Sequence, residues 1–270
     1  MTTRQLTEMT RAEVRAAAPS AIAVLPIGSQ EQHREHLPMG TDTFLVEAVL
    51  AEATAGHSSN LVLLPSLPYG YSDHHLFSAA VSLSPRTHLA VLSDVLASLS
   101  ESGFRRIMVV NGHGGNQETM SLAIKHHALT HKDVTIGACS YWLVAPDDAG
   151  DPAAKVEEPS LTPGHAGWFE TSLMLVAKPE LVRRNLMHYE SVEPAPVFDK
   201  PLYPGLQTER SGEWGRVDGG TDTAKSATAE AGHALLARRA CGLANAISAF
   251  DKATSSGNSI AYDEKDDTTA

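Results

Sequence analysis

The sequence predicts an α/β fold, a three-layer sandwich with a mostly parallel central sheet flanked by helices. Two observations support this fold class. Short apolar runs typical of buried strands alternate with longer segments in which apolar residues recur every three or four positions. Glycine-rich or polar turns separate the two kinds of segment. Strand–helix–strand repeats of this kind form parallel sheets whose right-handed crossovers cover both faces.

The first half of the chain contains a regular alternation of predicted elements. In order, we expect a helix over 11–18 with Thr10 as its N-cap, a strand over 21–28, a helix from 44 to about 56, a strand over 61–65 and a helix over 86–102. The last of these is the clearest, because its leucines and valine keep the helical spacing and Gly103 supplies a C-cap.

The second half begins in the same style and then changes. We expect a strand over 106–110, a helix over 117–129, a strand over 134–142, a loop over 145–163, a helix over 169–176 and a final helix over 227–250. Residues 189–223 are rich in Pro and Gly and predict an extended flap or edge. We interpret 1–253 as one domain and 254–270, which has few apolar residues, as a disordered tail.

Composition restricts the function classes. The 270 residues carry a net charge of -11, whereas nucleic-acid and anionic-membrane partners require a basic face. No apolar run approaches the ~20 residues needed to span a bilayer, and the first residues lack a signal-peptide pattern. The two cysteines, Cys139 and Cys241, form no CxxC pattern and predict no disulfide framework. We therefore expect a cytoplasmic protein.

Histidines and carboxylates follow two of the predicted strands at the same end of the sheet. Glu31, His33, His36 and Asp42 come after the strand over 21–28, and His113 follows the strand over 106–110. In an extended segment Glu31 and His33 point to the same face, and the two oxygens of Asp42 can bridge two ions. Oxygen and nitrogen ligands without thiolate fit Zn, Mn or Fe. The spacing predicts one metal site built from two loops.

The glycines of the second loop allow another interpretation. A turn such as Gly112–Gly115 before a helix can hold an anion on backbone N–H groups. The run is neither a Walker loop nor GxGxxG, and a histidine at its centre suits a metal better than a phosphate. A non-catalytic anion-binding α/β domain stays open as the alternative from a different function class.

Taken together, the motifs resemble the creatininase (creatinine amidohydrolase) family. The matching segments lie in order at 28–33, 36–38, 41–42, 111–116 and 165–172. The resemblance extends from about Leu25 to Leu175, and weakly to the final helix. It implies a three-layer α/β fold, a two-metal centre, hydrolysis of an amide-type C–N bond, and a homo-oligomer that in this family is often a hexamer.

The resemblance also implies roles for individual residues. Four positions match metal ligands of the family: Glu31, His33, Asp42 and His113. Asp42 would bridge the ions. Creatininase has a glutamate where this chain has Gly115, so we expect Glu170 to complete the ligand set. His165 matches a histidine near the substrate and would protonate the departing nitrogen.

Several departures from the family concern the substrate. Arg34 replaces a common glycine and would add a cation at the mouth of the site, and residues 78–81 stand where a Phe-Pro-Gly-Thr-like segment is usual. Creatinine is therefore an unsafe inference. The candidates for substrate binding are Ser72, His75, Gly114, Trp142 and Trp168.

The sequence thus predicts a metal-dependent amidohydrolase with two divalent ions per subunit (Zn, Mn or Fe). Its substrate would be a small cyclic amide, a formamide or a related linear amide, attacked by a metal-activated water. Within the same class, a creatininase-like peptidase that trims a small precursor peptide is the alternative.

Overall fold

The computed structural model describes residues 3–144, 163–199, 202–203 and 205–255. Five strands form one sheet in the order β1-β3-β2-β4-β5, and every neighbouring pair is parallel. The strands are β1 (Arg4–Gln5), β2 (Ile22–Ile27), β3 (Leu61–Leu63), β4 (Arg106–Asn111) and β5 (Thr135–Ser140). The predicted α/β fold with a parallel sheet is confirmed.

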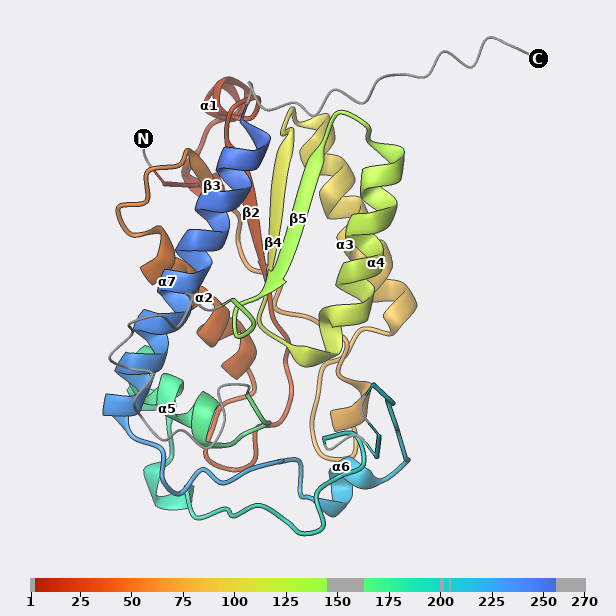
Figure 1. Ribbon diagram of the computed structural model, residues 1–270, viewed down its shortest axis with the longest axis vertical. Helices are drawn as coiled ribbons and strands as arrows, with labels where there is room; N and C mark the ends of the chain where they lie inside the picture. The colour runs from red at the N-terminus through yellow and green to blue at the C-terminus, as the bar shows by residue number, and fades with distance from the viewer. Residues whose placement is uncertain (1–2, 145–162, 200–201, 204, 256–270) are drawn as a thin grey trace, which may run out of the picture.

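Helices cover both faces of the sheet (Figure 1). On one face lie α2 (Thr41–Thr54), α5 (Trp168–Ala177) and α7 (Ala229–Thr254), and on the other lie α1 (Arg11–Ala17), α3 (Pro85–Glu101) and α4 (Gln117–Thr130). Successive residues of a strand point to opposite faces. Accordingly Ile22 and Val24 pack in the first hydrophobic cluster, while Ala23 and Leu25 pack in the second. The three layers follow from this alternation.

Local sequence signals set where several helices begin. Thr10 and Glu13 form a capping box at the start of α1, as the predicted N-cap requires. Ser84 caps α3, whose first residue is Pro85. Thr228 caps the long final helix.

Two elements differ from the sequence prediction. β1 is a two-residue edge strand in a stretch with a helical pattern, and its pairing with β3 is a long-range contact that local periodicity does not reveal. α2 begins at Thr41, earlier than expected, with Gly40 as its N-cap. Asp42 therefore lies in the first turn of a helix and is held more rigidly than a loop residue.

The segment over 189–223 forms no strand among its described residues. It contains the short helix α6 (Glu213–Arg216) and passes over the end of the sheet toward which the strand arrows point (Figure 1). It is thus a cover over that end and not an edge of the sheet. The expected loop over 145–163 lies outside the described residues except for Pro163. Of the expected tail over 254–270, Thr254 is instead the last residue of α7 and Ser255 is its C-cap, and 256–270 lie outside the described residues. No helix in the described part of the chain is long and apolar enough to span a membrane.

Candidate metal centre

The carboxyl ends of β2 and β4 bring two polar loops together. Ile27 and Asn111 are paired at the ends of these adjacent strands. The loop after β2 carries Glu31 and His33, and the loop after β4 carries His113. Ligands in open parallel sheets bind at this edge, where the loops diverge. The expectation that two loops contribute to one site is met in the geometry.

Two further carboxylates reach the same place from helices. Asp42 comes from the first turn of α2, and Glu170 from the first turn of α5. All these side chains are buried, with Glu31 and His33 at 0% exposure and Glu170 at 7%. The five residues expected as metal ligands therefore lie together, although they come from four separate segments of the chain.

These residues form two groups that share one carboxylate. Glu31, Asp42 and His113 make the first group, and His33, Asp42 and Glu170 make the second. Within each group the potential ligand atoms lie within 4.8 Å of one another. The two oxygens of Asp42 face different histidines, since Oδ2 is 3.1 Å from His113 Nδ1 and Oδ1 is 3.3 Å from His33 Nε2.

The ring orientations suit metal binding. His33 Nδ1 lies 3.2 Å from the backbone carbonyl of Glu31, to which it can donate, so its Nε2 faces Asp42 and Glu170. His113 Nε2 lies 2.9 Å from the carbonyl of Tyr71, so its Nδ1 faces Asp42. Metal-binding histidines commonly donate their other N–H to a carbonyl in this way.

Buried polar atoms without partners indicate that this site suits a cation. Both carboxylate oxygens of Glu31 and Nε2 of His33 are buried and have no hydrogen-bond partner in the described part of the chain. A buried carboxylate without donors is costly, and a divalent cation removes that cost. Ser29 donates to Asp42 Oδ2 at 2.8 Å and holds the shared carboxylate in place. This donor set fits divalent ions.

The pKa values in the cluster reflect the same crowding. Burial raises the pKa of Glu31 to about 7. Burial would also raise that of Asp42, but the neighbouring His33 and His113 hold the Asp42 pKa well below its usual range. Burial opposes protonation of His113, yet Glu31 and Asp42 raise its pKa to about 9. In the metal-free protein, protons held by Glu31 and His113 thus balance the charge that bound cations would otherwise balance.

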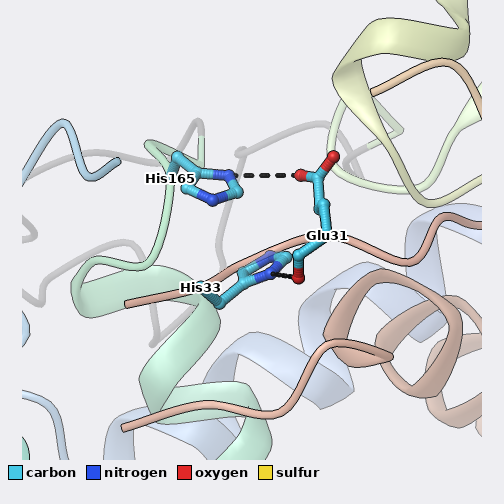
Figure 2. A group of neighbouring side chains, drawn as sticks. All are labelled: Glu31, His33 and His165. Atoms are coloured by element: carbon cyan, nitrogen blue, oxygen red, sulfur yellow. Dashed lines mark hydrogen bonds and ion pairs between the residues drawn. The ribbon is translucent and has the colours of Figure 1, made fainter. Parts of the chain in front are cut away.

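Two more histidines face the first group. His165 Nδ1 and His75 Nε2 each lie 3.5 Å from Glu31 Oε1. Figure 2 shows the His165 ring opposite the Glu31 side chain, with His33 bonded to the Glu31 backbone. Burial lowers the pKa of both His75 and His165, so both rings are neutral near pH 7.

A cavity of about 1100 Å³ opens onto the cluster. Gly114 and Trp142, both expected at the substrate, line it. Ser72 is fully buried behind the ligands, with its hydroxyl 3.3 Å from His113 Nε2. Trp168 does not reach the cavity. It is the first residue of α5, and its ring packs in the hydrophobic cluster beneath that helix.

The surroundings of Gly115 leave no room for the glutamate that the resemblance to creatininase would place at this position. A Cβ here would lie 2.2 Å from the Tyr71 carbonyl oxygen and 2.6 Å from His113 Nε2. No glutamate fits without moving backbone. The carboxylate of Glu170 instead lies 3.6 Å from His33 Nε2.

Arg34 is not a cation at the mouth of the site, as the sequence suggested. Its guanidinium is largely buried and donates to the carbonyls of Val217, Gly220 and Asp222. It also lies 4.8 Å from the Tyr189 ring. The long side chain folds back into the protein, where it donates to these carbonyls. It thereby links the cover segment over 189–223 to the loop that carries Glu31 and His33.

Sequence reasoning missed Trp214 in the cover. This half-buried residue of α6 lines the cavity, with its ring 4.5 Å from His75 and 4.3 Å from Phe198. A lone tryptophan in the polar, glycine-containing run 211–215 was the available signal. Gln32 was also missed, although it lies between two ligands and contacts both His75 and His165.

The sequence of the chain is similar to a described protein family and to enzymes with a named activity. A sequence model for the family described as creatininase, creatinine amidohydrolase, matches residues 7–247. Creatinine amidohydrolase of Pseudomonas putida is 29% identical, covering 87% of this chain and 92% of its own. The mycofactocin precursor peptide peptidase of Mycobacterium tuberculosis (strain CDC 1551 / Oshkosh) is 30% identical over 72% of each chain.

Solved structures give the same result. A crystal structure of creatinine amidohydrolase (creatininase) superposes with a TM-score of 0.74 at 27% identity, covering 91% of this chain and 96% of the other. A creatininase described as the Mn form and a variant described as Zn–Zn type superpose with TM-scores of 0.72 and 0.71, both at 28% identity over 90% of this chain and 96% of the other. With the ligand groups described above, these similarities support a divalent metal in this chain.

Proposed function

The chain belongs to the creatininase family and is a hydrolase acting on carbon–nitrogen bonds, and we propose that it hydrolyses a small cyclic amide, a formamide or a related linear amide with two divalent ions per subunit. The observation that carries this proposal is Asp42, whose two oxygens belong to two separate ligand groups. A single-ion site would leave one of those groups without a cation.

The proposed ligand sets follow from the contacts. Glu31, Asp42 and His113 would hold one ion, and His33, Asp42 and Glu170 the other. When bound, such ions lower the pKa of water toward neutrality and polarise a carbonyl group. Three carboxylates with neutral histidines would balance most of the charge of two divalent ions.

The protein's own groups would then handle the proton and the solvent. His165 Nδ1, which is directed at Glu31, would accept a proton from the attacking water and pass it to the departing nitrogen. The new C–O bond replaces the C–N bond, and the amine leaves with that proton. Trp214 and Phe198 cover the histidines and would limit access of bulk water to the reacting atoms.

A peptidase acting on a small precursor peptide is the second candidate. The cavity of about 1100 Å³ exceeds the volume that most small-molecule pockets reach, roughly 300–1,000 Å³. The similarity to mycofactocin precursor peptide peptidases supports the same alternative. A homo-oligomer such as a hexamer, a single domain over 1–253 and a cytoplasmic location remain proposals.

Elemental analysis of the purified protein, coupled to a screen for amine release, tests this function. We expect divalent metal in stoichiometric amount and turnover of a cyclic amide, a formamide or a short peptide. Chelation should abolish the turnover, and Mn²⁺ or Zn²⁺ should restore it. Full activity in metal-stripped protein would contradict the proposal, and purification without any divalent metal would favour an anion-binding domain.

A further inference from the structure

Gln32 lies between the two neutral histidines that face Glu31, and its hydrogen bonds can all be assigned. The side-chain oxygen accepts the Arg34 backbone N–H at 2.8 Å. This contact fixes the orientation of the amide, so its nitrogen points the other way. The two N–H bonds of that nitrogen are directed to the Gly219 carbonyl at 3.0 Å and to His75 Nδ1 at 2.8 Å.

This orientation determines the tautomer of His75. Because the Gln32 amide donates to Nδ1, that ring nitrogen carries a lone pair. The ring is neutral, so its proton is on Nε2. Nε2 is buried, makes no hydrogen bond among the described residues and lies 3.5 Å from Glu31 Oε1. His75 therefore presents an N–H donor on the side of Glu31 Oε1.

His165 has the same Nε2–H tautomer but faces Glu31 through its other ring nitrogen. Its Nε2 lies 2.7 Å from the backbone carbonyl oxygen of Gln32, to which only an N–H can donate. The same nitrogen is 3.2 Å from the Gln32 amide nitrogen, whose two N–H bonds are already used on Gly219 and His75. A His165 ring that holds one proton therefore carries it on Nε2, and its Nδ1, 3.5 Å from Glu31 Oε1, has the lone pair.

We propose that Gln32 is a positioning residue that fixes the Nε2–H tautomer in both His75 and His165. Because the two rings face Glu31 through different nitrogens, His75 is the hydrogen-bond donor and His165 the proton acceptor of the same site. This assignment rests on the proposed function. His75 Nε2–H would stabilise the negative charge that develops on the carbonyl oxygen of the amide, and His165 Nδ1 would carry the proton from water to the leaving nitrogen.

The fixed amide also explains local features of the cover segment. A Cβ on Gly219 would lie 2.2 Å from the Gln32 amide nitrogen, and Gly219 has a φ of +64°. Only glycine allows the Gly219 carbonyl to approach Gln32 with this backbone conformation. The cover segment thus contributes an acceptor that keeps the amide in its orientation.

Gln32→Glu is the matched variant for a test, because glutamate has the same shape but cannot donate to His75 Nδ1. His75 should then move its proton to Nδ1 and lose the donor at Nε2. We expect kcat to fall by about 10²- to 10³-fold, the effect of removing one oxyanion donor, with a much smaller change in KM. Gln207→Glu, an exposed glutamine outside the cavity lining, serves as the charge-matched control and should retain wild-type kinetics.

The tautomers themselves can be read without any turnover. Neutron diffraction, or ¹⁵N NMR of histidine-labelled protein, should find hydrogen on Nε2 of both rings and on Nδ1 of neither. Gln32→Glu should change His75 alone.

His75→Gln, which restores an N–H near Nε2, should retain more activity than His75→Leu. A proton on His75 Nδ1 in the wild type, or an unchanged kcat and tautomer in Gln32→Glu, would overturn the proposal. If the tautomers are as stated and no amide is hydrolysed, the proposed function fails and not this assignment.

Discussion

Charged side chains gather at both ends of the sheet, but the two groups differ in how their charges are satisfied. At the amino end, Arg106 at the start of β4 pairs with Asp251 of α7, and Ser59 donates to the same carboxylate. At the carboxyl end, the oxygens of Glu31 and Nε2 of His33 have no hydrogen-bond partner among the described residues.

This difference distinguishes a structural cluster from a functional one. A carboxylate with its donors in place contributes to stability and requires nothing more. A buried cluster without donors reduces stability unless a ligand completes it, which is a recurrent cost of active sites. Charge alone therefore does not locate the site, whereas unpartnered buried atoms at the carboxyl ends of the strands do.

The largest expected effect is from Asp42→Ala, which removes the carboxylate shared by both ligand groups. We expect hydrolysis to fall by about 10³-fold or more and bound metal to be lost, with an unchanged far-UV circular dichroism spectrum. Elemental analysis and an amine-release assay measure both effects. Asp251→Asn removes a negative charge at the opposite end and should leave activity intact. Full metal content in Asp42→Ala would contradict the ligand assignment.

Glu170→Gln should have a smaller effect, because it weakens only the second group. We expect metal content to fall from two ions to one per chain, with activity reduced by about 10²-fold. Adding Gly115→Glu should not restore the second ion, because the new Cβ would lie 2.2 Å from the Tyr71 carbonyl oxygen. Restoration of two ions in the double variant would show that position 115 can serve as the ligand in this chain.

The unpartnered carboxylate of Glu31 should also affect how the stability of the metal-free protein depends on pH. Burial raises the pKa of Glu31 from 4.5 to about 7. In this window the folded metal-free protein keeps a proton that the unfolded chain releases, so its free energy of unfolding falls as the pH rises. We expect Tm measured with chelator to decrease between about pH 4.5 and 7, and Glu31→Gln to remove that part of the decrease. An identical Tm profile for the two proteins would contradict the burial argument.

The smallest effect is expected at the amino end. Asp251→Asn weakens the bonds to Arg106 and Ser59 at a partly exposed position, so we expect a loss of about 1 kcal/mol in the free energy of unfolding. Urea unfolding measures this loss, and kcat should stay at the wild-type value. A large loss of activity would mean that the two ends of the sheet are coupled.

Much of the fold was predictable because periodicity and caps are local. The helix start at Thr10 and the apolar strands over 21–28 and 106–110 follow directly from residue order. β1 was not predictable, since a two-residue edge strand exists only through its pairing with β3. The cover over 189–223 lacks periodicity, and its fold depends on contacts such as those of Arg34 with distant carbonyls.

The candidate site also has one part that local sequence predicts and another part that depends on tertiary contacts. Glu31, His33 and His113 stand in motifs that follow strands, so sequence order alone places them at one edge of the sheet. Trp168 was expected at the substrate but packs in the core, and Trp214, for which no role was expected, lines the cavity. Whether a tryptophan faces a core or a cavity depends on tertiary packing. The tautomers of the histidines require the hydrogen bonds themselves, which no sequence pattern contains.

The central claim is that two ions share Asp42, and anomalous diffraction from crystals grown with Mn²⁺ or Zn²⁺ tests it most directly. We predict two anomalous peaks in each chain. One should lie among Glu31, Asp42 and His113, and the other among His33, Asp42 and Glu170. A single peak, or peaks that Asp42 does not join, would contradict the account.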